Sequence, residues 1–181
     1  MKKWLWLLLI PPVLAVAFVW AFPGQALQAE YARQRWQADA TVKTQDVAGE
    51  TWHYLEAGQG PLILLVHGYT GSKENWLPMM PALTANHRVV AVDLPGWGES
   101  APKPGQDYSP LAQAERLRLL LAKLSPEPRI LVTHYPICLK NGRKEKRTHG
   151  LVDLAQVLDI ANAGGVSLWL HGHRHGFYVQ P

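Results

Sequence analysis

The sequence predicts an α/β fold: a small, mostly parallel, doubly wound sheet preceded by an N-terminal transmembrane or signal helix. Short apolar segments alternate with helix-like segments, which is typical of parallel strands joined by crossover helices. The apolar segments are LILLV (62–66), RVVAVD (88–93), RILVTH (129–134) and VSLWL (166–170). A second observation concerns the N-terminus, where an apolar run from Trp4 to Phe22 approaches the roughly 20 residues that a membrane-spanning helix requires.

The N-terminal run favours passage of the body across a membrane. Lys2 and Lys3 precede it, and such lysines tend to stay on the cytoplasmic side. We therefore expect residues 1–25 to be a membrane anchor that leaves the body on the non-cytoplasmic side, periplasmic in a bacterium. A signal peptide is the alternative, because Gly24 to Ala26 offers a small-residue cleavage site, and the protein would then be secreted. Residues 26–45 are predicted to contain a linker helix.

The remaining elements follow from local patterns. TWHYL (51–55) is predicted to be a strand, and a short helix around 76–84 has Ser72 as a candidate cap. Ser109 and Pro110 favour a helix start, since a capping hydroxyl is followed by proline at the first position. A last helix is expected over 151–163, where Gly164 and Gly165 end it.

Composition limits the classes of protein to consider. With 48% hydrophobic and 18% charged residues the chain is not disordered, and its 181 residues can bury one ordinary core. The net charge of +4 is modest, so we expect no nucleic-acid partner. The basic run KNGRKEKR (140–147) is interpreted as a solvated loop, with attraction of an anion as the alternative. The single cysteine excludes an internal disulfide.

Two stretches carry a first resemblance: YLEAGQGPLILLVHGYTGSKENW (54–76) and RVVAVDLPGWGES (88–100). On these motifs, residues from about 45 to 124 resemble the amino-terminal part of the α/β-hydrolase family. The resemblance implies that the backbone N–H of Tyr69 contributes to an oxyanion hole, with His67 and Gly68 shaping the turn. The alternative is that HG forms only a structural turn.

The nucleophile of that family is missing in its usual form. An α/β-hydrolase carries G-x-S-x-G on its next strand, and this chain has ILVTHYP there instead, with Tyr135 near the place of the serine. GESAP (98–102) contains Ser100, but it belongs to a loop that precedes the expected position. The sequence therefore predicts a hydrolase scaffold whose catalytic set is incomplete.

A second resemblance rests on ILVTHYPI (130–137) and LHGHRH (170–175). Residues from about 129 to 181 resemble the carboxy-terminal part of calcineurin-like metallophosphoesterases. The resemblance implies that His134 and His173 bind one divalent metal ion and His175 a second, with zinc, iron or manganese suited to imidazole. The family's D-x-H and G-D motifs are absent, which argues against a two-metal clamp, so a single metal or a solvated histidine loop remains.

Together these patterns predict a hybrid in which a partial α/β-hydrolase (46–126) and a partial metallophosphoesterase tail (127–181) share one sheet. The first function considered is a membrane-anchored hydrolase, weak or inactive, acting on a small ester or phosphoester. The second is a non-catalytic protein that binds a metal or a partner, and the third is a non-functional fusion relic.

Overall fold

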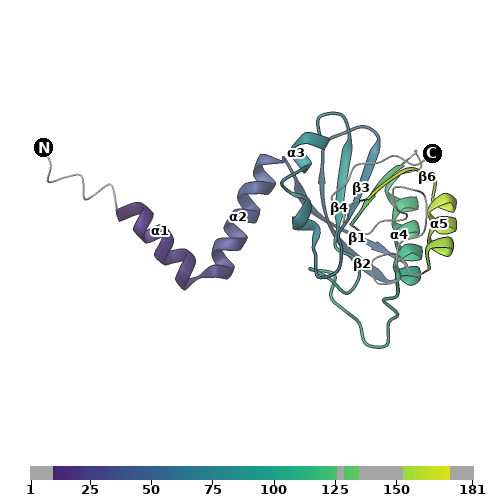
Figure 1. Cartoon of the computed structure of the whole chain (residues 1–181), viewed down its shortest axis with the longest axis horizontal. Helices are drawn as coiled ribbons and strands as arrows, with labels where there is room; N and C mark the ends of the chain where they lie inside the picture. Colours follow the sequence, from purple (N-terminus) through teal and green to yellow (C-terminus); the bar gives the residue numbers. More distant parts are fainter. Residues whose placement is uncertain (1–9, 126–128, 135–152, 172–181) are drawn as a thin grey trace, which may run out of the picture.

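The computed structural model describes residues 10–125, 129–134 and 153–171. Its elements follow the alternation of apolar and helix-like segments that the sequence predicts (Figure 1). In chain order they are α1 (Ile10–Ala21), α2 (Pro23–Gln37), β1 (Thr41–Val47), β2 (Glu50–Ala57), β3 (Leu62–Val66), the 3₁₀ helix η2 (Lys73–Trp76), α3 (Met80–Leu83), β4 (Arg88–Val92), α4 (Pro110–Leu124), β5 (Arg129–Thr133), α5 (Leu154–Ala163) and β6 (Val166–His171).

The strands form one mixed sheet of six strands in the order β1-β2-β4-β3-β5-β6. Strands β4, β3, β5 and β6 are parallel neighbours, whereas β1 pairs with β2 and β2 with β4 in antiparallel fashion. The α/β class is confirmed, but the sheet is more mixed than the mostly parallel one expected. The difference arises at β1, which occupies the end of the segment assigned to the linker: α2 stops at Gln37, and Thr41 begins a hairpin with β2.

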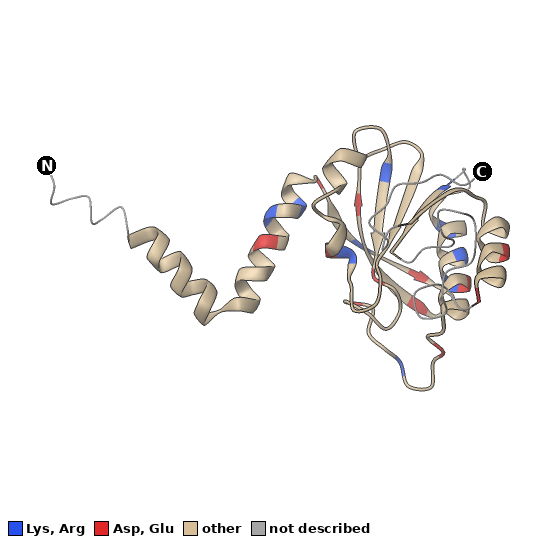
Figure 2. Cartoon of the chain, in the orientation of Figure 1, with Lys and Arg blue, Asp and Glu red and all other residues tan. Residues whose placement is uncertain are grey.

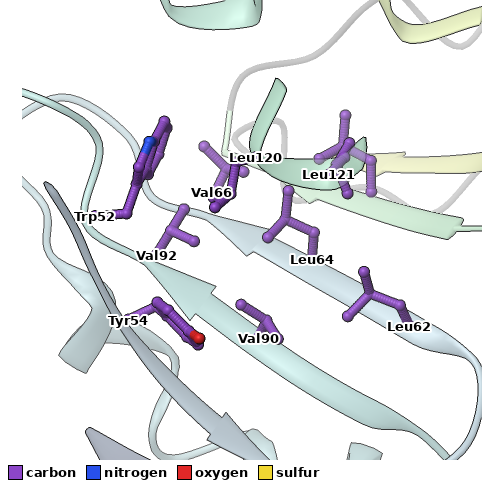
Figure 3. Packing of buried hydrophobic residues seen from close by; sticks show 10 residues of the cluster. Trp52, Tyr54, Leu62, Leu64, Val66, Val90, Val92, Leu120 and Leu121 are labelled. Carbon is purple, nitrogen blue, oxygen red and sulfur yellow. The ribbon is translucent and has the colours of Figure 1, made fainter. Parts of the chain in front are cut away.

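Helices cover both faces of the sheet, as a doubly wound arrangement requires. One face packs on α4, where alternate side chains of the central strands meet Leu120 and Leu121 (Figure 3). The opposite face packs on Leu77 and Met80, from the η2–α3 segment, and on Ala38 at the end of α2. Helix α5 lies beside α4, on the same side of the sheet (Figure 1).

Local capping agrees with the sequence in two places and differs in one. The Ser109 hydroxyl accepts a hydrogen bond from the Ala112 N–H at 3.3 Å, so α4 begins as predicted. Gly165 follows α5 with φ of +70°, a backbone conformation that glycine adopts without strain. Ser72 caps the 3₁₀ helix η2, which ends at Trp76, whereas the helix within the segment predicted around 76–84 is α3, with Met79 at its N-cap.

The register of the sheet brings three chain segments to one edge. Val66 at the end of β3 pairs with Thr133 of β5, which pairs in turn with His171 of β6. Because parallel strands end at the same side, the turn after β3, His134 after β5 and the end of β6 leave the sheet together.

The N-terminal helices form a bent arm that projects from the sheet (Figure 1). Helix α1 carries no charged residue along its length (Figure 2), and none of its residues is buried. In the described part of the chain no single helix is long and apolar enough to cross a bilayer, although α1 and α2, bent by 113°, pass that criterion as a pair. The bend falls at Pro23, which lacks the N–H that a continuous helix would use.

Candidate functional site beside the HG turn

His67 fixes the turn that follows β3. Its Nε2 accepts a hydrogen bond from the Leu94 N–H at 3.1 Å, and its Nδ1 lies 2.7 Å from the Gly68 carbonyl oxygen. Both bonds form only when Nδ1 carries the proton, so the imidazole is neutral and in one tautomer. Burial lowers the pKa of His67 below its ordinary value, which favours the same neutral form. His67 therefore ties the HG turn to the loop after β4.

Tyr69 stands at the outer end of this turn. The residue is 74% exposed, and its ring packs edge-on against Trp97, with 5.0 Å between the ring centroids and 71° between the planes. Among the described residues no acceptor receives the Tyr69 backbone N–H. The next residue, Thr70, has φ of +60°, which is strained for a β-branched side chain. The turn thus presents an N–H of the kind that stabilises an oxyanion.

A buried ion network holds the loop after β4. The Asp93 carboxylate, at the end of β4, accepts hydrogen bonds from Lys73 Nζ at 2.8 Å, from the Lys73 N–H at 2.7 Å and from the Glu99 N–H at 2.9 Å. Burial acts to lower the pKa of Lys73, but hydrogen bonds to Asp93 and Glu99 outweigh it and raise that pKa. Lys73 is therefore a charged partner for Asp93.

Ser100 serves the same loop. Its hydroxyl donates to the Asp93 carbonyl oxygen at 3.2 Å and accepts from the His53 N–H at 3.3 Å, and the side chain is buried. Both hydrogen-bonding roles of the hydroxyl are thus taken by the backbone. This arrangement fits the sequence reasoning that set Ser100 aside as a nucleophile.

His134 lies directly over the HG turn. A Cβ built on Gly68 would come within 2.8 Å of the Cδ2 and Cγ atoms of the His134 ring. Glycine at position 68 therefore lets the imidazole approach the backbone of the turn. The structure brings two of the predicted site residues, Tyr69 and His134, to one place.

The other predicted metal ligands, His173 and His175, lie outside the described residues, as does Tyr135. Within the residues that the structure does describe, no three His, Cys, Asp or Glu side chains come together as a metal site. A metal centre formed by His134, His173 and His175 consequently remains a prediction from the sequence.

An open cavity of about 250 Å³ lies beside the turn, between the sheet edge and the helices α4 and α5. Its walls are mainly apolar, and most of its polar side chains are already paired. The lining residues include His67, Gly68, Tyr69, Trp97, Tyr108, Gln113, Ala114, Arg118, His134 and Trp169. Space for a small apolar molecule thus adjoins a backbone N–H and an imidazole.

Sequence reasoning missed the walls of this cavity. Trp97, Gln113 and Trp169 come from three distant segments, and only the fold places them together. For Gln113 a signal existed: it is a polar residue four positions before Leu117 and eight before Leu121, so it falls on the same apolar face of the helix that Ser109 caps. A polar residue on a buried stripe indicates a specific role.

Proteins of known family and known structure that are similar to this chain agree with this geometry. Residues 61–134 match the family described as alpha/beta hydrolase fold. A bacterial membrane phospholipase A has a solved structure with a TM-score of 0.60 and 30% identity, covering 75% of this chain and 44% of that one. Residues 61–134 therefore form part of an α/β-hydrolase fold domain.

Two relatives are similar in sequence. "Uncharacterized protein Rv2715" of Mycobacterium tuberculosis is 34% identical over 130 residues, which is 72% of this chain and 37% of that protein. The pimeloyl-[acyl-carrier protein] methyl ester esterase of Vibrio atlanticus is 45% identical over 62 residues, 34% of this chain and 23% of the esterase. The chain thus spans well under half the length of these relatives.

The family match also bears on the predicted junction. It continues through β5 to His134, past the boundary near 124–129 that the sequence analysis placed between two families. Strand β5 pairs in parallel with β3 in full register, so it extends the hydrolase sheet without a break. These matches give no support to a metallophosphoesterase part.

Proposed function

We propose that this chain takes a small, largely apolar ester into the cavity beside the HG turn and hydrolyses it. The observation that carries the proposal is the joint placement of Tyr69 and His134 at one apolar cavity. One of the similar proteins is named as a methyl ester esterase and another as a phospholipase, which supports this class of substrate.

The chemistry assigned to the site uses water as the nucleophile. The ester carbonyl oxygen accepts a hydrogen bond from the Tyr69 N–H, which stabilises the negative charge that develops on it. His134 removes a proton from a water molecule as the oxygen of that water bonds to the carbonyl carbon. The tetrahedral intermediate then expels the alcohol oxygen, which takes the proton from the imidazolium, leaving an acid and an alcohol.

Water is assigned this role because the described residues that line the cavity include no serine and no cysteine. A reaction without a covalent intermediate is expected to be slow beside that of a serine esterase. Slow turnover agrees with the incomplete catalytic set that the sequence predicts.

Hydrolysis of 4-nitrophenyl butyrate by the full chain tests the proposal. We expect a rate above that of buffer, and a loss of roughly 100-fold in His134→Ala, since positioned general bases contribute about that much. His87→Ala is the matched control, because His87 does not line the cavity. A wild-type rate equal to that of buffer, or a His134→Ala rate equal to that of wild type, contradicts the proposal.

We also propose that α1 places the domain at a lipid bilayer, with the body on the non-cytoplasmic side. The support is its uncharged, fully exposed apolar surface, which includes Trp20 at 87% exposure. Helix α2 follows α1 in the chain, and its Arg35 pairs with Glu74 of the 3₁₀ helix η2 at 3.6 Å. Flotation with phosphatidylcholine vesicles tests this: wild type should float, and Val16→Lys, Val19→Lys should not. Gln25→Lys on α2 is the control.

As a second candidate we retain a divalent metal held by His134, His173 and His175, which would give the chain a phosphoesterase or metal-binding function. The observation that favours it is the shared edge of β5 and β6, because His134 directly follows β5 and the other two histidines follow β6 in sequence. Imidazole nitrogens suit zinc, iron or manganese.

A further inference from the structure

The cavity beside the HG turn continues away from the turn, between the sheet and the helices α4 and α5. At the turn it is lined by Tyr69 and His134, and at its other end by Gly164 and Val166. Val166 pairs with Arg129 at the start of β5, whereas His134 directly follows the end of that strand. The cavity therefore spans the full length of β5.

The dimensions of this space are those of one extended hydrocarbon chain. Between the levels of Val166 and Thr133 the strand advances four residues, or about 13 Å at about 3.3 Å per residue. Dividing the volume of about 250 Å³ by this length leaves a mean cross-section of about 19 Å², or a width of about 5 Å. Carbon atoms in contact lie about 3.5 to 4.0 Å apart, so this width admits a single unbranched chain.

Length and volume give the same number of carbon atoms. An extended chain of single bonds of about 1.5 Å advances about 1.3 Å per bond, so about 13 Å holds about ten carbons. A dry cavity of about 150 Å³ takes up benzene, which has six carbons, so about 250 Å³ also holds about ten.

The walls of the cavity are apolar along its middle. Leu121, Leu131 and Val157 line it, and each of them is buried. Arg118 lines the end beside Gly164, but its guanidinium donates to the Glu115 carboxylate at 2.6 Å and so already has an anionic partner. An uncharged methyl end of a ligand therefore fits there.

We propose that the cavity binds an unbranched acyl chain of about ten carbons, so that the preferred substrate is an ester of a medium-chain fatty acid. The ester carbonyl lies at the HG turn and the methyl end beside Gly164. Each methylene buried against these walls strengthens binding about fourfold. This inference rests on the proposed function for the ester bond, but binding tests it without turnover.

The experiment measures the binding of methyl ketones to the full chain by ligand-observed NMR titration. The series runs from 2-pentanone to 2-tridecanone in steps of two carbons, so the acyl part lengthens while no ester bond is present to be cleaved. We expect binding to wild type to tighten on the order of 10-fold per step as far as 2-undecanone, whose acyl part has ten carbons, and to gain nothing at 2-tridecanone.

A matched pair of variants on α5 tests where the acyl chain ends. Ala161 lines the cavity, so Ala161→Phe fills part of its far end. Binding to this variant should stop tightening at least one step earlier, while 2-pentanone binds as it does to wild type. Ala163→Phe makes the same change at an exposed position of α5 that does not line the cavity, and it should keep the wild-type series.

The outcomes separate the two proposals. Binding that does not tighten beyond 2-pentanone overturns the inference, and so does binding that still tightens at 2-tridecanone, as adsorption to the apolar surface of α1 would. An unchanged series in a folded Ala161→Phe also overturns it, and the wild-type series decides alone if that variant fails to fold. A limit at 2-undecanone without hydrolysis of 4-nitrophenyl decanoate supports the inference and removes the proposed hydrolysis, whereas hydrolysis without the limit does the reverse.

Discussion

The His134 ring rests on Gly68, so the end of β5 and the turn after β3 meet at a position where an added side chain would overlap the imidazole. This contact sets the imidazole beside the Tyr69 backbone at the mouth of the cavity.

Gly68→Ala should therefore impair catalysis more than stability. The added Cβ collides with a ring that can move aside, so the chain stays folded while His134 shifts by a few tenths of an ångström or more. Displacements of about 1 Å cost enzymes on the order of 100-fold in rate, and we expect the ester hydrolysis rate to fall at least about tenfold. Gly24→Ala is the control, since nothing lies within 4 Å of its added Cβ. A Gly68→Ala rate equal to that of wild type would remove His134 from the mechanism.

Gly98→Ala should impair stability instead. Its Cβ would overlap the carboxyl group of Asp93, which is fully buried and pairs with Lys73. Disturbing a buried ion pair in this way typically costs about 3 kcal/mol or more. Gly105→Ala is a matched control, because Gly105 also has a positive φ, of +73°, but open space around it. In urea denaturation, the free energies of unfolding of the two variants should differ by at least about 2 kcal/mol, because the control carries only backbone strain of roughly 1 kcal/mol. Equal losses would contradict this account.

His67 should make the protein less stable in mild acid. Burial lowers its folded-state pKa below the ordinary value of 6.5, so as pH falls through 6.5 the unfolded chain takes up a proton that the folded chain resists. The free energy of unfolding then decreases by at most about 1.4 kcal/mol per pH unit until the folded-state pKa is reached. In urea titrations of His67→Gln, the free energy of unfolding should change less between about pH 7.5 and about pH 5.5 than it does in wild type. An unchanged difference would show that His67 is not the responsible group.

Metal analysis tests the second candidate function. If His134, His173 and His175 hold one ion, the purified full chain should contain about one zinc, iron or manganese per molecule, as three histidines with an open position can bind. The His173→Ala, His175→Ala variant should lose it, while His87→Ala keeps it. A folded wild-type chain without metal after dialysis against zinc would rule the site out.

The sequence predicted the interior of the sheet well because burial leaves a clear pattern. LILLV and RVVAV are continuous apolar runs, and they became β3 and β4 with every residue from Leu62 to Val66 buried. β1 was not predicted because TVKTQDV is a mostly exposed edge strand that pairs only with β2. Its side chains are mostly polar, so the sequence shows no regular apolar face there.

Prediction of the site failed where partners come from distant segments. The HG turn and His134 each follow an apolar strand and were singled out by two separate family resemblances, which assigned Tyr69 to an oxyanion hole and His134 to a metal. The pairing of Lys73 with Asp93 and the walls formed by Trp97 and Trp169 depend on how loops close over the sheet, and no spacing in the sequence encodes that closure.

Filling the cavity tests the central claim most directly. Ala114 lines the cavity from α4, and Ala114→Trp would occupy the space assigned to the ester. Ala82→Trp makes the same change on α3, where Ala82 is exposed on the other side of the sheet. We predict that Ala114→Trp loses at least about tenfold of the wild-type rate on 4-nitrophenyl butyrate while remaining folded, and that Ala82→Trp keeps that rate. Hydrolysis by Ala114→Trp at the wild-type rate would contradict the claim that the ester binds in this cavity.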